Sequence, residues 1–178
     1  MTTVVLVGSS IFEAWTGAGG IAPGRRLVNR AVGGTITRYW VEHLPGLLAA
    51  DCPDALGFYC GSNDVNQGVP EPEILDHIAR CREMAGAIPF AYFGIIKAPQ
   101  KAGKFGLIDR LNARVRGRLC AADLYVELND LLCPAGRPMR EYYLSDGLHM
   151  TEDAYAAITR FVRPAFTDWL AGLSSSRA

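Results

Sequence analysis

Apolar residues gather in five short, nearly continuous runs along the chain. These runs cover residues 3–8, 26–32, 55–60, 90–96 and 124–128. Runs of this length, bounded by glycine and polar residues, are typical of strands that are covered on both faces. The pattern therefore predicts five strands that are buried inside a parallel sheet.

Between these runs, apolar residues recur at every third or fourth position, which is the spacing of one face of a helix. One such stripe consists of Ile74, Ile78, Cys81 and Ala85, and another consists of Ile108, Leu111, Val115 and Leu119. Residues 39–50 show a weaker stripe, which Pro45 is expected to interrupt because proline removes a helical hydrogen bond.

A last helix is predicted to begin after Thr151. The threonine hydroxyl can cap the helix, and Glu152 and Asp153 place negative charge beside the exposed N–H groups of the first turn. Its apolar face consists of Ala154, Tyr155, Ile158, Phe161 and Val162. Pro164 is expected to kink or end this helix.

The alternation of strands and helices over the whole length predicts one doubly wound α/β domain. For five strands, we expect a flavodoxin-like three-layer α/β/α sandwich with a parallel sheet in the order 2-1-3-4-5. The domain is expected to span residues 1–172, and residues 173–178, which include three serines, are expected to form a disordered tail.

Composition narrows the possible partners and the compartment. The chain has 178 residues, and its 18 lysines and arginines balance its 18 aspartates and glutamates. Without a basic patch, nucleic acid is not an expected partner. The apolar run at residues 87–96 is shorter than the ~20 residues that cross a bilayer, so no membrane association is expected. The N-terminal residues lack the basic start of a secretory signal, and a cytoplasmic protein is expected.

Cysteine and histidine usage gives no sign of a metal or cofactor. The five cysteines contain no CxxC pair, and reduced, buried thiols are the simplest interpretation. The sequence has no HExxH motif, no phosphate-binding P-loop and no GxSxG nucleophile elbow. We therefore expect no metal and no cofactor.

The oligomeric state stays open, because the apolar C-terminal helix could pair with the same helix of a second copy of the chain.

Polar and glycine residues stand at the ends of the first three predicted strands. The first strand ends in Gly8-Ser9-Ser10, the second runs into residues 29–34, and the third ends in residues 61–64, Gly-Ser-Asn-Asp. Ligands of open α/β sheets bind at the carboxyl ends of the strands. These three segments are therefore expected to meet at one edge of the sheet.

A carboxylate and an imidazole precede the last predicted helix. Asp146 and His149 are three residues apart, and a tight turn would let Asp146 accept a hydrogen bond from one ring nitrogen of His149. The other ring nitrogen would then face a serine hydroxyl, which is the arrangement of a nucleophile, a base and an orienting acid.

Four segments resemble the four sequence blocks of the SGNH, or GDSL-like, hydrolases, and the match runs along nearly the full chain. They are GSSIFEAW (8–15), NRAVGGT (29–35), GSNDVNQG (61–68) and DGLHMTEDAY (146–155). The first block resembles that of a bacterial branch of this lipase/acylhydrolase family, which has GSS in place of GDS. Ser9 stands where many members have aspartate, and Ala31 stands where many have glycine.

The resemblance implies the SGNH-hydrolase fold and a serine esterase that cleaves a small acyl or acetyl ester, including an ester of a carbohydrate. It implies that Ser10 is the nucleophile and that Asp146 and His149 complete the catalytic triad. The oxyanion hole would consist of the backbone N–H of Ser10, Gly34 and the side chain of Asn63.

Two other functions stay open. The same triad could serve a thioesterase or a lysophospholipase-like hydrolase, because the fold does not fix the substrate. A non-catalytic flavodoxin-like module that binds an anion or FMN is the alternative from another class. The zero net charge favours a neutral or weakly charged small-molecule ester.

Overall fold

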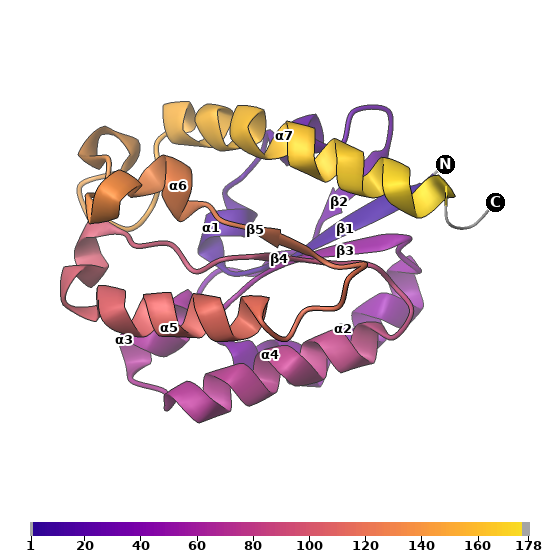
Figure 1. The fold of residues 1–178 in the computed structure, drawn as a ribbon, viewed down its shortest axis with the longest axis horizontal. Coiled ribbons are helices and arrows are strands. Elements are labelled where there is room, and N and C mark those ends of the chain that lie inside the picture. Colours follow the sequence, from indigo (N-terminus) through magenta and orange to yellow (C-terminus); the bar gives the residue numbers. More distant parts are fainter. Residues whose placement is uncertain (1, 176–178) are drawn as a thin grey trace.

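The computed structural model describes residues 2–175, in which a five-stranded sheet lies between two layers of helices (Figure 1). The strands are β1 (Thr3–Gly8), β2 (Arg26–Asn29), β3 (Ala55–Tyr59), β4 (Phe90–Phe93) and β5 (Leu124–Val126). Their order is β2-β1-β3-β4-β5, and every neighbouring pair is parallel. The predicted flavodoxin-like order is therefore confirmed.

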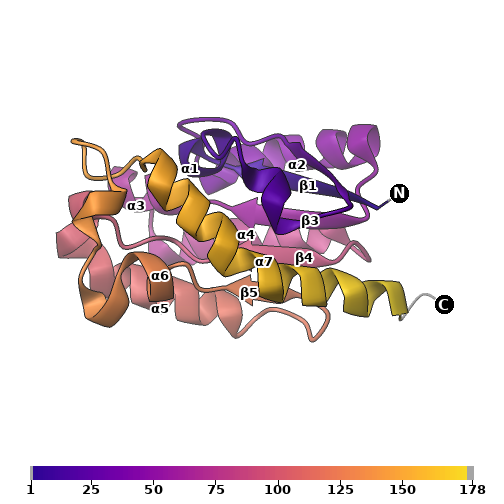
Figure 2. The same cartoon turned by 90° about the horizontal axis from the view of Figure 1, so that it is seen from above.

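Helices cover both faces of this sheet. Helices α2 (Thr37–Asp51), α4 (Glu71–Ala85) and α5 (Phe105–Arg116) pack on one face, and α1 (Ser10–Glu13) and α7 (Glu152–Ser175) pack on the other (Figure 2). The shorter segments are η1 (Ala18–Ile21), α3 (Ser62–Gln67), η2 (Pro99–Lys104), α6 (Asn129–Leu132), η3 (Pro134–Gly136) and η4 (Arg140–Tyr142).

Alternating strand side chains build the two halves of the core. In β1, Val4 and Leu6 pack toward α1 and α7, while Val5 and Val7 pack toward α2 and α4. All four side chains are fully buried. Strands buried on both faces explain why the sequence shows continuous apolar runs instead of a two-residue alternation.

The prediction that Pro45 interrupts its helix is wrong, and α7 does not end at Pro164. Pro45 lies inside α2 and Pro164 lies inside α7, and both helices continue past them. In α7 the reason is packing: Val162 and Phe166, which flank Pro164, are both buried against the sheet. Tertiary contacts of this kind can outweigh the loss of one helical hydrogen bond.

Several predicted boundaries also change. Four strands end before the predicted positions: those predicted over residues 26–32, 55–60, 90–96 and 124–128 end at Asn29, Tyr59, Phe93 and Val126. Residues 173–175, predicted as part of a disordered tail, belong to α7, and residues 176–178 lie outside the described residues.

The five cysteines are free thiols that differ in burial. Cys60, Cys81 and Cys133 are buried free thiols, but Cys52 and Cys120 are exposed, contrary to the prediction that the thiols are buried.

Within residues 2–175, no helix combines the length and the apolar character that crossing a bilayer requires.

Candidate active site

The loops after β1, β2 and β3 meet at one edge of the sheet, as predicted. Thr35 joins them: its hydroxyl lies 3.2 Å from the carbonyl oxygen of Gly8 and 2.9 Å from that of Val32. The carbonyl of Thr35 accepts a hydrogen bond from the side-chain amide of Asn63 at 2.9 Å. One buried threonine therefore fixes the three loops relative to each other.

Ser10 is the first residue of α1, and α7 holds this short helix in place. The phenol of Tyr155 donates to the carbonyl of Ile11 at 2.9 Å, and the indole N–H of Trp15 donates to the hydroxyl of Thr159 at 2.9 Å. The side chains of Ile11 and Trp15 are buried beneath α1. The hydrophobic core and α7 therefore fix the position of the short helix that carries Ser10.

A tight loop holds Asp146 and His149. The N–H of Leu144 donates to the carbonyl of His149 at 2.8 Å, and the N–H of Gly147 donates to the carbonyl of Leu144 at 2.9 Å. Gly147 has a φ angle of +67°, a conformation that favours glycine. The hydroxyl of Thr151 then caps α7 by accepting the N–H of Ala154 at 3.2 Å, as predicted.

Ser10, His149 and Asp146 form a continuous hydrogen-bonded chain, which we call the triad. Nδ1 of His149 lies 2.6 Å from Oδ2 of Asp146, and Nε2 of His149 lies 3.1 Å from Oγ of Ser10. Because the carboxylate accepts the hydrogen on Nδ1, Nε2 carries the lone pair that faces the serine hydroxyl.

The triad is ionised at Asp146 and open to solvent. The hydrogen bond from His149, together with the backbone N–H groups of Leu148 and His149, lowers the pKa of Asp146 to about 2. The side chains of His149 and Asp146 are 40% and 46% exposed. Water therefore has direct access to the imidazole.

Each of the three loops that Thr35 joins carries an N–H group with no acceptor assigned to it within residues 2–175. The N–H of Ser10 is in the first turn of α1, where no intrahelical acceptor exists. Gly34 has a φ angle of +76°, and within residues 2–175 its N–H bonds to no acceptor. The amide of Asn63 uses one N–H on Thr35 and has a second N–H to donate.

A buried polar cluster lies directly behind Asn63. The carboxylate of Asp64 accepts the N–H of Thr37 at 3.0 Å and its hydroxyl at 2.5 Å, and Nδ1 of His77 lies 3.0 Å from the same hydroxyl. Burial raises the pKa of Asp64, although the two bonds from Thr37 oppose that shift. His77 of α4 is buried in this cluster, where it bonds to a residue of another helix.

The family model for GDSL-like lipases and acylhydrolases matches residues 7–157, which include the triad and the donor loops. The chain belongs to the GDSL-like lipase/acylhydrolase family. Its members cleave esters, so the chain is a carboxylic ester hydrolase, as predicted. No curated protein matches the sequence significantly.

Solved structures share the fold of this GDSL-like hydrolase. A GDSL-like lipase from Bacteroides thetaiotaomicron superposes with a TM-score of 0.79 at 20% identity, over 94% of this chain and 88% of that chain. TesA gives 0.77 at 20% identity, over 94% and 99%. An alanine variant of an acetyl esterase, solved with acetate ion, gives 0.72 at 17% identity, over 97% and 100%.

A pocket of about 410 Å³ lies beside α1 of this hydrolase, and no residue of the triad lines it. It is bounded by Glu13 of α1 and Ala31 of the loop after β2. Its other lining residues are Trp15, Thr16, Ala18, Gly19, Leu27 and Asn29. The lining therefore combines polar and apolar side chains.

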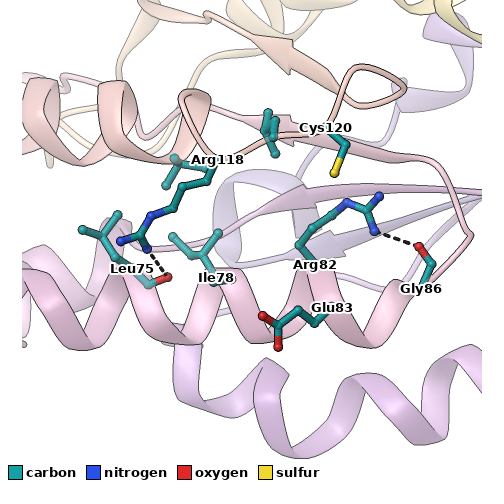
Figure 3. Close-up of a pocket in the computed structure, with 10 residues that line it drawn as sticks. Leu75, Ile78, Arg82, Glu83, Gly86, Arg118 and Cys120 are labelled. Carbon is teal, nitrogen blue, oxygen red and sulfur yellow. Dashed lines mark hydrogen bonds between the residues drawn. The ribbon is translucent and has the colours of Figure 1, made fainter.

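A second pocket, of about 480 Å³, lies between α4 and α5 (Figure 3). Its lining includes Leu75, Ile78 and Val115, with Arg82 and Arg118 at its rim. Arg82 already pairs with Asp123 at 2.7 Å and donates to the carbonyl of Gly86 at 2.9 Å. No segment of the triad lines this pocket, so it is separate from the candidate active site.

Sequence reasoning missed the residues that hold the site together. Thr35 and Thr37 lie two residues apart and His77 lies on α4, and no local pattern indicates that these residues contact Asn63 and Asp64. Lys101 is also buried at this edge, although lysine in a loop is ordinarily exposed. Across residues 2–175, no group of three or more His, Cys, Asp or Glu side chains is arranged to hold a metal ion.

Proposed function

We propose that this hydrolase is a serine esterase that cleaves small acyl esters, acetyl esters first among them, through an acyl-enzyme on Ser10. The observation that carries the proposal is the unbroken hydrogen-bonded chain from Oγ of Ser10 through His149 to Asp146. A serine hydroxyl is a weak nucleophile unless an adjacent base can take its proton, and His149 is within hydrogen-bond distance to do so.

In the first half of the reaction, Oγ of Ser10 attacks the acyl carbon while Nε2 of His149 takes the hydroxyl proton. The carbonyl oxygen becomes an oxyanion, which the N–H groups of Ser10, Gly34 and Asn63 stabilise. The carbon–oxygen bond to the alcohol then breaks, and His149 returns the proton to the departing oxygen. The products of this half are the free alcohol and an ester between the acyl group and Ser10.

In the second half, water attacks the acyl-enzyme. His149 takes a proton from water, the hydroxide adds to the acyl carbon, and the same donors stabilise the second oxyanion. The bond to Ser10 breaks, and its oxygen regains a proton from His149. The exposure of the imidazole supports this step, because water can reach it without movement of a lid.

The openness of the site supports a small acyl group. The side chains of His149 and Asp146 are 40% and 46% exposed, so a long acyl chain bound at the triad would bury little of its apolar surface. The pocket beside α1 presents the polar side chains of Glu13 and Thr16, which suit a hydroxylated alcohol such as a sugar. The acetyl esterase among the similar structures agrees with this preference.

A set of esters tests the substrate preference. With p-nitrophenyl acetate, butyrate and octanoate, we expect kcat/KM to fall at least about tenfold from the two-carbon to the eight-carbon acyl group, because the longer chain gains little burial. Acetylated sugars and an acetyl thioester measured alongside distinguish an esterase from a thioesterase. A higher kcat/KM for octanoate would contradict the small-acyl preference and favour the lysophospholipase-like alternative.

The carboxylate of Asp146 should leave the pH profile unchanged between pH 4 and 8. Because the pKa of Asp146 is lowered to about 2, its carboxylate stays ionised above about pH 4, and its stabilising bond to His149 is lost only as the pH falls through that pKa. Asp146 should therefore add no inflection to the profile of kcat/KM for p-nitrophenyl acetate in that range. An inflection between pH 4 and 8 that disappears in Asp146→Asn would contradict this prediction.

A further inference from the structure

Lys101 is a buried lysine without a carboxylate partner. Its residue is 1% exposed, and within the described residues no ion pair involves it. Removing an ammonium group from water costs several kcal/mol unless other groups compensate. A buried ammonium group beside a candidate active site, compensated by neutral oxygen atoms alone, is therefore a candidate for a functional role.

The ammonium group of Lys101 bonds to both ends of α3. Nζ donates to the carbonyl oxygen of Ser62 at 3.0 Å and to the side-chain oxygen of Asn66 at 2.7 Å. Ser62 immediately precedes Asn63, whose side chain is assigned to the oxyanion under the proposed function. Lys101 consequently fixes the peptide from which the Asn63 side chain extends.

The segment that carries Lys101 also contacts the loop of the triad. The N–H of Gln100 donates to the carbonyl of Gly147 at 3.0 Å, and the side chain of Asn66 donates to the side chain of Gln100 at 3.0 Å. A Cβ atom at Gly147 would lie 3.3 Å from the nitrogen of Gln100, so the two segments are tightly packed. Segment η2 thus connects the helix of Asn63 with the loop of Asp146 and His149.

From this geometry we propose that Lys101 is a positioning residue of the oxyanion hole, which holds Asn63 at a fixed place relative to His149. The proposal rests on the proposed function, since it assigns Asn63 to the oxyanion. Donors fixed in advance stabilise a developing negative charge far better than mobile donors, and a displacement of about 1 Å can cost about 100-fold in rate.

The positive charge of Lys101 strengthens its hydrogen bonds to Ser62 and Asn66. Burial, and to a lesser extent Lys104, lowers the pKa of Lys101 to about 8. The other titratable groups near this junction are Asp64 on α3 and the Asp146–His149 pair behind Gln100. A neutral amine keeps two N–H donors, but a hydrogen bond from a charged donor is about twice as strong as one from a neutral donor. Deprotonation of Lys101 therefore weakens its hydrogen bonds to Ser62 and Asn66.

Activity and stability should respond to this titration in opposite directions. The folded protein releases the proton of Lys101 more readily than the unfolded chain does, so this group adds to the free energy of unfolding as the pH rises from about 8 toward 10.5. Over the same pH range, kcat should fall by about two- to fivefold, because the hydrogen bonds from Lys101 to Ser62 and Asn66 weaken. A merely structural lysine would not give this combination.

The test compares Lys101→Met, which keeps the length of the side chain without its charge and donors, with Lys97→Met as a control. Lys97 is half-buried and pairs with Asp109. With p-nitrophenyl acetate at pH 7.5, we expect Lys101→Met to lower kcat about 10- to 100-fold with KM changed less than about twofold. The alkaline fall in kcat should disappear in Lys101→Met and persist in Lys97→Met. If Lys101→Met does not fold, Lys101→Gln takes its place.

A double-mutant cycle with Asn63→Ala decides whether Lys101 acts through Asn63. Asn63→Ala should lower kcat about 10²- to 10³-fold, and adding Lys101→Met should then lower it by less than about threefold. A wild-type kcat in folded Lys101→Met, or an equal loss with and without Asn63, would overturn the inference while leaving the esterase in place. An absence of ester hydrolysis by the wild-type protein would overturn the proposed function and the inference together.

Discussion

Ser10→Ala is expected to lower kcat for p-nitrophenyl acetate by about 10⁴- to 10⁶-fold, because no other group can form the acyl-enzyme. The donors at Gly34 and Asn63 remain in this variant, so KM should change little. The fold should also persist, since the Ser10 side chain bonds to His149 and lies outside the hydrophobic core.

Ser145→Ala is a matched control for this substitution. Ser145 is exposed in the loop beside Asp146, and its replacement should leave both kcat and the melting temperature unchanged. If Ser10→Ala retained more than about a tenth of the wild-type kcat, Ser10 would not be the nucleophile.

Asp146→Asn is expected to lower kcat by about 10³- to 10⁴-fold with little change in size or charge distribution elsewhere. The asparagine NH₂ group would donate to Nδ1 of His149, which moves the ring hydrogen to Nε2. A protonated Nε2 cannot accept the proton of Ser10, because its lone pair is no longer available.

The control for Asp146→Asn is Glu141→Gln, another exchange of carboxylate for amide at an exposed residue of the same region. It should leave kcat within about twofold of the wild type. Equal losses in the two variants would show a general electrostatic effect and would contradict the role of Asp146 in setting the tautomer.

The sheet was predictable from the sequence because its strands are short, apolar on both faces and separated by clear helical stripes. Their carboxyl-terminal ends were not predictable. After Gly94, the chain bonds to side-chain amides instead of a neighbouring strand: Asn112 accepts the N–H of Ile95 at 2.8 Å, and Asn129 accepts the N–H of Lys97 at 2.7 Å. The apolar residues after Phe93 resemble a strand in sequence, but the side chains of Asn112 and Asn129, which are distant in sequence, bind their backbone in place of a neighbouring strand.

The proximity of Ser10, His149 and Asp146 was predictable because Ser10 follows the first strand and the other two residues precede the last helix, which places both segments at one edge of the sheet. The support behind them depends on tertiary contacts. His77 meets Thr37 across two helices, and Lys101 reaches α3 from a loop rich in glycine and lysine. A sequence pattern shows which residues can carry out a reaction more readily than it shows which residues hold them in place.

The central claim is that Ser10 is the nucleophile, and covalent labelling tests it most directly. The purified protein would be treated with a fluorophosphonate and its peptides analysed by mass spectrometry. The account predicts one phosphonyl adduct per chain, located on Ser10, and none in Ser10→Ala. An adduct on a different residue, or hydrolysis of p-nitrophenyl acetate by protein that never forms an adduct, would contradict it.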